Sequence, residues 1–140
     1  MDDVAAQWTF ADAWVFASIE GTSRDNGCRL VDIIARADGI NHALLSEAEF
    51  TRAVPRLVAA GLIGTDAVAD RYWHTDAGQA LYQRRMRRHG LFGWMDAIPP
   101  ALRGLGAPQD GAWSLPAGAF ARATRTYARE ADKTVRDLLG

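Results

Sequence analysis

The sequence contains only one cysteine, Cys28, and no long apolar run. A single cysteine excludes an intrachain disulfide bond and a cysteine-rich zinc site. No segment reaches the roughly 18 consecutive apolar residues that span a bilayer. The acidic start, Met1-Asp2-Asp3-Val4, leads into no apolar core segment, so it is unlike a secretory signal. We therefore expect a cytoplasmic protein that has no membrane partner.

Patterns that carry catalysis or bind metals are also missing from the sequence. The histidines His42, His74 and His89 are scattered, and none pairs with an acidic or sulfur ligand at metal spacing. There is no glycine-rich phosphate loop and no nucleophile elbow. Helix capping accounts for the closely spaced carboxylates Glu47 and Glu49. We expect a protein that is not an enzyme and that needs no metal and no cofactor.

Neither sign of charge dominates the whole chain, in which 16 basic and 17 acidic side chains give a net charge of -1. The balance conceals two opposite parts. Residues 1–83 have six basic and twelve acidic side chains, whereas residues 84–140 have ten basic and five acidic ones. Because a nucleic-acid binder needs cations on its contact surface, the function depends on where the basic part lies.

Apolar residues at helical spacing predict two helices in the first 45 residues. Thr9, followed three residues later by Asp12, resembles a capping box and opens the first helix. The second helix begins near Leu30, and Asp38-Gly39 predicts its end, with Gly39 suited to a left-handed cap.

The third helix has the clearest start in the chain. Residues 46–49, Ser-Glu-Ala-Glu, form a capping box, and Gly61 predicts the end of the helix. Pro55 removes one backbone hydrogen bond in the helix interior, so we expect a bend there. The predicted core residues of this helix are Phe50, Val54, Leu57 and Val58.

A hairpin, a fourth helix, an irregular segment and a last helix are predicted for the rest of the chain. Residues 62–64 and 72–74 flank a polar stretch and predict two short strands. Thr75 caps a helix that runs to about His89, with Gly90 as its terminator. Residues 91–118 contain four of the five prolines and predict an irregular segment that Trp94 and Trp113 fix to the domain surface. The last helix spans about 117–139.

Two segments carry a resemblance to a known fold. Residues 56–63, Arg-Leu-Val-Ala-Ala-Gly-Leu-Ile, are similar to the end of a recognition helix that enters a wing. Residues 72–78, Tyr-Trp-His-Thr-Asp-Ala-Gly, are similar to a second wing strand that leads into the next helix. With three helices before the hairpin, residues 9–89 resemble the winged helix-turn-helix domain of MarR- and PadR-type regulators and of small winged-helix proteins from high-GC bacteria.

The resemblance implies that residues 46–60 lie in the major groove of DNA and that residues 64–72 form the wing. The side chains it makes available for DNA contact are Ser46, Thr51, Arg52, Arg56 and Arg71. Glu47, Glu49, Asp66 and Asp70 lie in the same segments, although DNA affinity depends on cations there. The expected function is therefore that of a DNA-binding, transcription-regulator-like protein. The alternative is a protein–protein interaction module that does not bind DNA through its recognition helix.

Nine further cations provide candidate contacts with phosphate groups or with a partner protein. They are Arg84, Arg85, Arg87, Arg88, Arg122, Arg125, Arg129, Lys133 and Arg136. The first four also suit the carbonyl end of the fourth helix. The last five recur at steps of three or four on one face of the last helix, and Phe120, Tyr127, Ala131 and Leu138 lie on another. That basic face is a solvated surface, or docks on the acidic part of the same or a partner chain, or contacts DNA.

These observations together predict a mostly helical protein with a small β-hairpin wing. The winged helix-turn-helix domain covers residues 1–90. Residues 91–140 form an extension that we expect to join two copies as a homodimer. Double-stranded DNA and another protein are the candidate partners. An apolar pocket between the irregular segment and the first helix is a candidate effector site.

Overall fold

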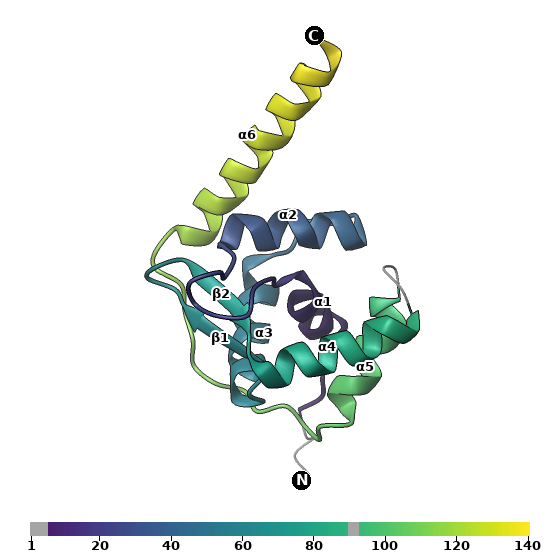
Figure 1. The fold of residues 1–140 in the computed structure, drawn as a ribbon. Coiled ribbons are helices and arrows are strands. Elements are labelled where there is room, and N and C mark those ends of the chain that lie inside the picture. Colours follow the sequence, from purple (N-terminus) through teal and green to yellow (C-terminus); the bar gives the residue numbers. More distant parts are fainter. Residues whose placement is uncertain (1–5, 90–92) are drawn as a thin grey trace.

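A computed structural model describes residues 6–89 and 93–140 of the chain. Within these residues, six helices and one antiparallel hairpin make a mostly helical fold, as the sequence predicts (Figure 1). The elements are α1 (Phe10–Ser18), α2 (Leu30–Asn41), α3 (Glu47–Ala59), β1 (Ile63–Asp66), β2 (Arg71–His74), α4 (Asp76–His89), α5 (Trp94–Arg103) and α6 (Ala119–Leu139).

Helix α1 lies in the middle of the body, packed against α2, α3 and α5 (Figure 1). Every residue from Asp12 to Ile19 is buried, so the helix is covered on nearly all sides. The broad buried face that its sequence predicts is therefore confirmed. Phe16 and Phe50 lie in the same apolar core, which continues to the hairpin through Tyr72. Burial of this apolar surface is the main contribution to the stability of the fold.

Both predicted capping boxes are present. The Asp12 carboxylate accepts a hydrogen bond from the Thr9 N–H at 2.8 Å, and the Asp12 N–H donates to the Thr9 hydroxyl at 3.2 Å. At α3, the Ser46 N–H donates to Glu49 Oε1 at 3.0 Å, and the Glu49 N–H donates to Ser46 Oγ at 3.1 Å. These bonds satisfy backbone donors that the first turn of a helix otherwise leaves unpaired.

The predicted end of α2 is wrong by three residues. The helix passes through Gly39 and ends at Asn41, and His42 adopts the left-handed conformation with a φ of 54°. The His42 N–H donates to the Asp38 carbonyl at 2.7 Å. Ile40 packs against the core, so the helix gains apolar contact by continuing past the glycine.

In α3, one of the predicted core positions is wrong. Val58 is 42% exposed, whereas Phe50, Val54 and Leu57 are fully buried. The helix ends at Ala59, and Gly61 follows with a φ of 75°, a left-handed conformation that suits a glycine after a helix. Pro55 lies inside the helix, where the bend stays a prediction.

The hairpin pairs Ile63 with His74 and Asp66 with Arg71. His74 is buried, and its Nε2 lies 2.9 Å from the Phe16 carbonyl oxygen. Burial lowers the pKa of this imidazole because it disfavours the charged form. After the hairpin, the Thr75 hydroxyl accepts from the Gly78 N–H at 3.1 Å and caps α4, as predicted. The predicted terminator, Gly90, lies outside the described residues.

The segment predicted to be irregular contains a helix, α5, in spite of Pro99 and Pro100. Its buried residues follow helical spacing and pack on α1 and α4, which explains why the helix forms. They are Trp94, Ala97, Ile98, Ala101 and Leu102. Residues 104–118, which we call the strap, contain no helix or strand and lead to α6.

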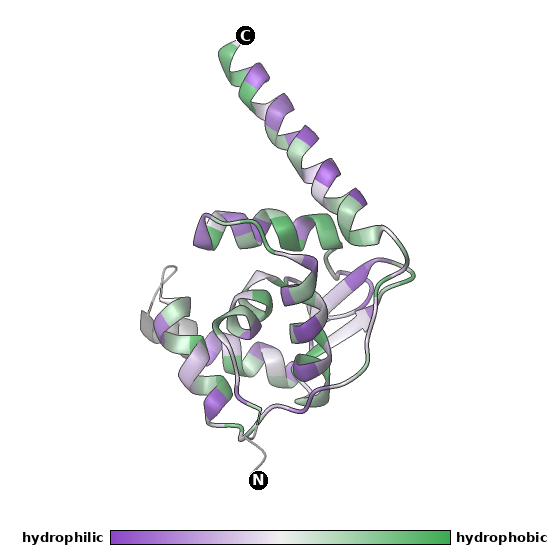
Figure 2. Cartoon of the chain, turned by 180° about the vertical axis from the view of Figure 1, so that it is seen from behind, coloured by the Kyte–Doolittle hydropathy of each residue, from purple (hydrophilic) through white to green (hydrophobic). Residues whose placement is uncertain are grey.

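Helix α6 begins directly after the strap and leaves the body as a projecting arm (Figure 1). Phe120 is buried and Tyr127 is half-buried, and both pack against the core next to α2. The Tyr127 hydroxyl donates to the Asp38 carboxylate. Every residue from Ala128 to Gly140 is exposed. We call residues 128–139 the distal half of α6; hydrophobic and hydrophilic residues alternate along it in Figure 2.

Candidate nucleic-acid interface

The first part of the predicted interface lies at the start of α3, where few free donors face the solvent. Ser46 is exposed, but its hydroxyl donates to Glu49 Oε1 at 2.9 Å and also caps the helix. Thr51 is half-buried, and its hydroxyl donates to the Glu47 carbonyl at 2.9 Å. Arg52 is exposed. Of the four α3 positions proposed for DNA contact, Arg52 alone presents an exposed cation.

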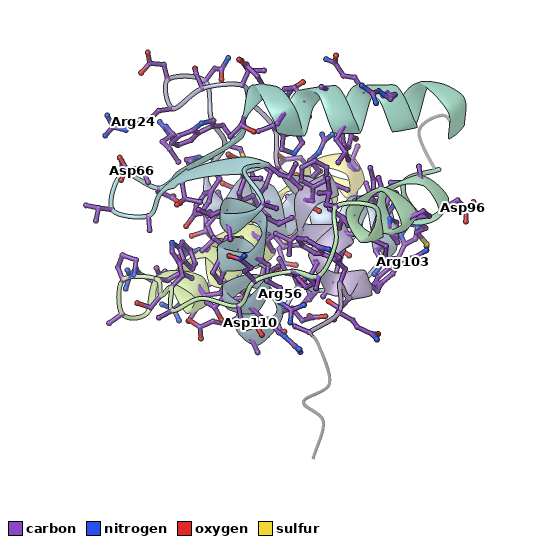
Figure 3. The ribbon with its side chains drawn as sticks, turned by 90° about the horizontal axis from the view of Figure 1, so that it is seen from below. Arg24, Arg56, Asp66, Asp96, Arg103 and Asp110 are labelled. Carbon is purple, nitrogen blue, oxygen red and sulfur yellow. The ribbon has the colours of Figure 1, made fainter. Side chains whose placement is uncertain are left out.

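Arg56 is not at the surface, contrary to the prediction. Its side chain is 1% exposed and lies between α1 and the strap (Figure 3). Its Nη1 donates to Asp12 Oδ2 at 2.9 Å and to the Gln7 carbonyl at 2.7 Å. Its Nε donates to Asp110 Oδ1 at 2.6 Å. The guanidinium therefore ties together three segments that are distant in the sequence, and it cannot reach a base or a phosphate from this position.

The charges around Arg56 are compensated within the protein. Burial alone would lower the pKa of Arg56, but its hydrogen bonds to Asp110 and Asp12 outweigh that effect and raise it. The bond to Arg56 in turn lowers the pKa of Asp110. Asp12 is itself buried and also accepts from the Thr9 N–H. In the sequence, an arginine in the expected recognition helix suggests DNA contact. Its observed partners, Asp12 and Asp110, lie 44 positions before it and 54 positions after it, and no spacing pattern in the sequence links them to it.

The hairpin offers a mixed surface rather than a basic one. Arg71 is half-buried and its Nη1 donates to the Asp70 carbonyl at 3.3 Å. Arg24 pairs with Asp66 at 2.7 Å, and Figure 3 shows the two side chains together beside the turn of the hairpin. The Ala69 N–H, and then Arg24, lower the pKa of Asp66 and keep it ionised. Asp70 accepts from the Leu30 N–H at 2.9 Å, at the start of α2.

The strap crosses the side of α3 that faces away from α1. It is held first where the Trp8 indole N–H donates to the Gly106 carbonyl at 2.8 Å. Asp110 then pairs with Arg56, and a Cβ placed on Gly111 would lie 3.4 Å from the Pro55 Cβ. Because Thr51, Pro55 and Val58 share one face of α3, the strap covers the middle of that face.

The end of the strap closes the space between α3 and the hairpin. The Trp113 ring lies 5.8 Å from the Phe50 ring and 6.3 Å from the Tyr72 ring, both in edge-to-face arrangements. These contacts confirm that Trp113 fixes this segment to the domain. They also place an aromatic side chain of the same molecule between the two elements that a winged helix presents to DNA.

The further cations fall into two groups. Arg84 is exposed near the end of α4, whereas the structure describes only the backbone of Arg85, Arg87 and Arg88. The five cations of α6, at positions 122, 125, 129, 133 and 136, are all exposed. Within residues 6–89 and 93–140, no ion pair joins any of these five to an acidic side chain. The basic face is therefore exposed and unpaired with the acidic side chains that the structure describes.

The expected effector pocket takes a different form from the prediction. A hollow of about 410 Å³ lies between the segment before α1 and the strap, lined by Trp8, Arg103 and Pro108 among others. Trp94 is instead buried in the core and Trp113 covers α3.

In the described part of the chain, no group of three His, Cys, Asp or Glu side chains is placed to hold a metal ion. No helix in that part has the length and apolar character needed to cross a membrane.

Comparison of the chain with protein-family models, with curated proteins and with solved structures finds no match. The geometry of α3, the strap and α6 is therefore what indicates the function.

Proposed function

We propose that this chain is a non-enzymatic protein-interaction module with a winged-helix-like core, and that it does not read DNA through α3. The element order supports the winged-helix assignment, since three helices precede a two-stranded hairpin and a capped helix follows it. A winged helix does not by itself imply DNA binding, so the function has to be argued from the surface.

The strap is the observation that carries this proposal. It lies across the outward face of α3, and its Asp110 carboxylate accepts a hydrogen bond from the Arg56 guanidinium. Its Trp113 ring fills the space between α3 and the hairpin. Duplex DNA would need that face open and positively charged. Glu47 and Glu49 lie in the first turn of α3, before the one exposed arginine there, and Asp110 is close enough to Arg52 for the arginine charge to lower the pKa of that carboxyl, so the local charge opposes phosphate binding.

The distal half of α6 is the surface that we assign to a partner. All of its residues are exposed, Leu138 to 82% and Leu139 to 84%. A helix that is apolar on one side is stable in proteins chiefly when that side is covered. A protein partner would supply the cover.

DNA binding through α6 is the second candidate, because its five cations are exposed on one face. Residues 122 to 136 extend over about 21 Å of helix, a length that spans several phosphates of a DNA strand. In this arrangement, the sequence-independent contacts would come from α6 and not from α3.

Fluorescence anisotropy with a labelled duplex of mixed sequence, at about 50 and 200 mM salt, tests both candidates. We expect no saturable binding by the native chain, and no change on Arg52→Ala. Saturable binding at low salt that Arg52→Ala removes would overturn the proposal. Binding that persists in Arg52→Ala but is lost in Arg125→Glu/Arg129→Glu would establish the second candidate instead. Arg103→Glu, on α5, is the control for reversal of a single charge outside α6.

A further inference from the structure

We infer that the distal half of α6 docks in a groove between α4 and α5 of a second copy of this chain. The inference builds on the interaction role proposed above, because it names the partner of the same helix. It also differs from the plain expectation of a homodimer, since it specifies which two surfaces meet.

The apolar stripe of α6 continues beyond the part that is buried in its own chain. Phe120 and Tyr127 pack on the body, and the same side of the helix then carries Ala131, Thr134 and Leu138. Val135 lies beside them and is 53% exposed. Positions 131, 134, 135 and 138 have the i, i+3, i+4, i+7 spacing of a helix that anchors in a groove. One half of the stripe is therefore covered in the monomer and the other half is open.

The groove lies on the far side of the body from the start of α6. A hollow of about 400 Å³ separates α4 from the end of α5, and most of its lining side chains are small. They are Ala77, Ala80, Leu81, Arg84, Ala101, Gly104 and Leu105. Ala77, Ala80 and Gly104 are exposed, so a partner helix can approach the backbone closely. Leu105 is 51% exposed beside them.

The two surfaces match in spacing and in length. The α4 residues of the groove, at positions 77, 80, 81 and 84, have the same i, i+3, i+4, i+7 spacing as the open stripe of α6. Each set covers eight residues, or about 10 Å of helix from the first to the last. Side chains at this spacing form one ridge on each helix, and ridges of this kind pack into the grooves beside one another.

Charge favours the groove over a second α6 as the occupant. Glu130 and Asp137, seven residues apart, border the same edge of the open stripe. In an antiparallel pair of α6 helices, these edges would face each other and the like charges would repel. The α4–α5 groove instead carries Arg84 at its edge. Its guanidinium can pair with a carboxylate of the incoming helix.

The contact between two copies is head-to-tail. Each copy offers one helix and one groove on opposite sides of its body, so the arm of one copy docks on the next, whose own arm stays available to a further copy (Figure 1). Each contact covers one apolar stripe and leaves the five-cation face, which lies on the other side of α6, in solvent.

Thiol cross-linking of mixed variants tests which surfaces meet. We expect Val135→Cys copies mixed with Ala80→Cys copies to yield a cross-linked dimer with a short bifunctional maleimide, and neither variant alone to do so. The native Cys28 should not react with the maleimide, because burial raises its pKa to about 11 and the protonated thiol is a poor nucleophile. The native chain is therefore the control without cross-linking. Cross-linking of Val135→Cys to itself would show that α6 pairs with α6 and would overturn the inference.

Sedimentation equilibrium of the full chain tests the energetics. Leu138→Asp is expected to raise the dimer dissociation constant at least tenfold, since it removes an anchor of the helix. Val68→Asp, at a hairpin position that is 93% exposed, should leave it unchanged. Glu130→Arg/Asp137→Arg and Arg84→Glu should each weaken the dimer, and the two together should restore it. Circular dichroism verifies that the variants fold.

A native chain that stays monomeric at all concentrations, or a dimer that neither Leu138→Asp nor Arg84→Glu weakens, would also overturn the inference. The outcome is independent of the DNA measurement. Binding of duplex DNA through α3 would refute the proposed function without altering these contacts, and a monomer would refute the docking without opening the face of α3.

Discussion

Arg56 carries its charge inside the protein, where an arginine is rare unless its guanidinium is paired. Its partners differ in kind. Asp12 is as buried as Arg56 itself, whereas the Asp110 side chain is 64% exposed. Water therefore cannot take the place of Arg56 beside the Asp12 carboxylate, whereas it can beside Asp110. The contact with Asp110 joins the strap to Arg56.

We predict that Arg56→Leu destabilises the protein by about 3–5 kcal/mol, because it leaves the Asp12 carboxylate buried without its cation. Urea unfolding followed by tryptophan fluorescence measures the change. Asp110→Ala removes the exposed partner and is the control, with a much smaller expected effect. Equal unfolding midpoints for Arg56→Leu and the native chain would show that the buried pair does not stabilise the fold.

At the scale of the elements, the sequence predicted what is decided locally. The capping boxes at Thr9 and Ser46, the hairpin and the cap at Thr75 depend on residues within a few positions of one another. The end of α2 and the existence of α5 do not. Gly39 and the prolines of α5 favour other conformations locally, but the helices continue because Ile40 packs against the core and Trp94 is buried in it.

The candidate site was less predictable than the fold for the same physical reason. Thr51 and Arg52 are where the helix pattern places them, on a side of α3 away from the core. Nothing in the sequence shows that the strap returns across that side. Its position depends on contacts with Trp8, Arg56 and Phe50, which lie between 54 and 98 residues away from their partners.

The strap should be stabilised mainly by the Trp113 ring. We predict that Trp113→Ala lowers the free energy of unfolding by about 2–3 kcal/mol, less than a fully buried tryptophan because the ring is half-buried. Trp113→Phe, which keeps an aromatic ring over Phe50 and Tyr72, should lose less than half as much. Chemical denaturation of both variants provides the comparison. Similar losses for Ala and Phe would indicate that ring contacts do not hold the strap.

At the scale of the whole molecule, a net charge of -1 describes an arm and a body of opposite sign. Residues 119–139 carry five basic and three acidic side chains, and the rest of the chain carries eleven basic and fourteen acidic ones. The sequence alone leaves open whether the arm lies on the body. Its distal half leaves the body in the monomer, so the attraction between the two parts is available to a second copy.

The division into arm and body predicts the effect of shortening the chain. A chain that ends at Ala128 keeps Phe120 and Tyr127 on the body and loses only exposed residues. As a monomer, it should unfold with a free energy within about 0.5 kcal/mol of the full chain. A chain that ends at Gly118 also loses the buried Phe120, and should be less stable by about 3–5 kcal/mol.

The dependence of the melting temperature on protein concentration distinguishes association of two copies through α6 from stabilisation of the monomer by α6. If the distal half of α6 joins two copies, the melting temperature of the full chain rises with concentration, because association stabilises the folded state by mass action. The chain that ends at Ala128 should show no such rise, although its melting temperature at high dilution equals that of the full chain. Differential scanning calorimetry over a hundredfold range of concentration makes the comparison. An equal rise of the melting temperature in both chains would place the contact between copies on the body. A lower melting temperature of the shortened chain at high dilution would mean that the distal half of α6 stabilises the monomer.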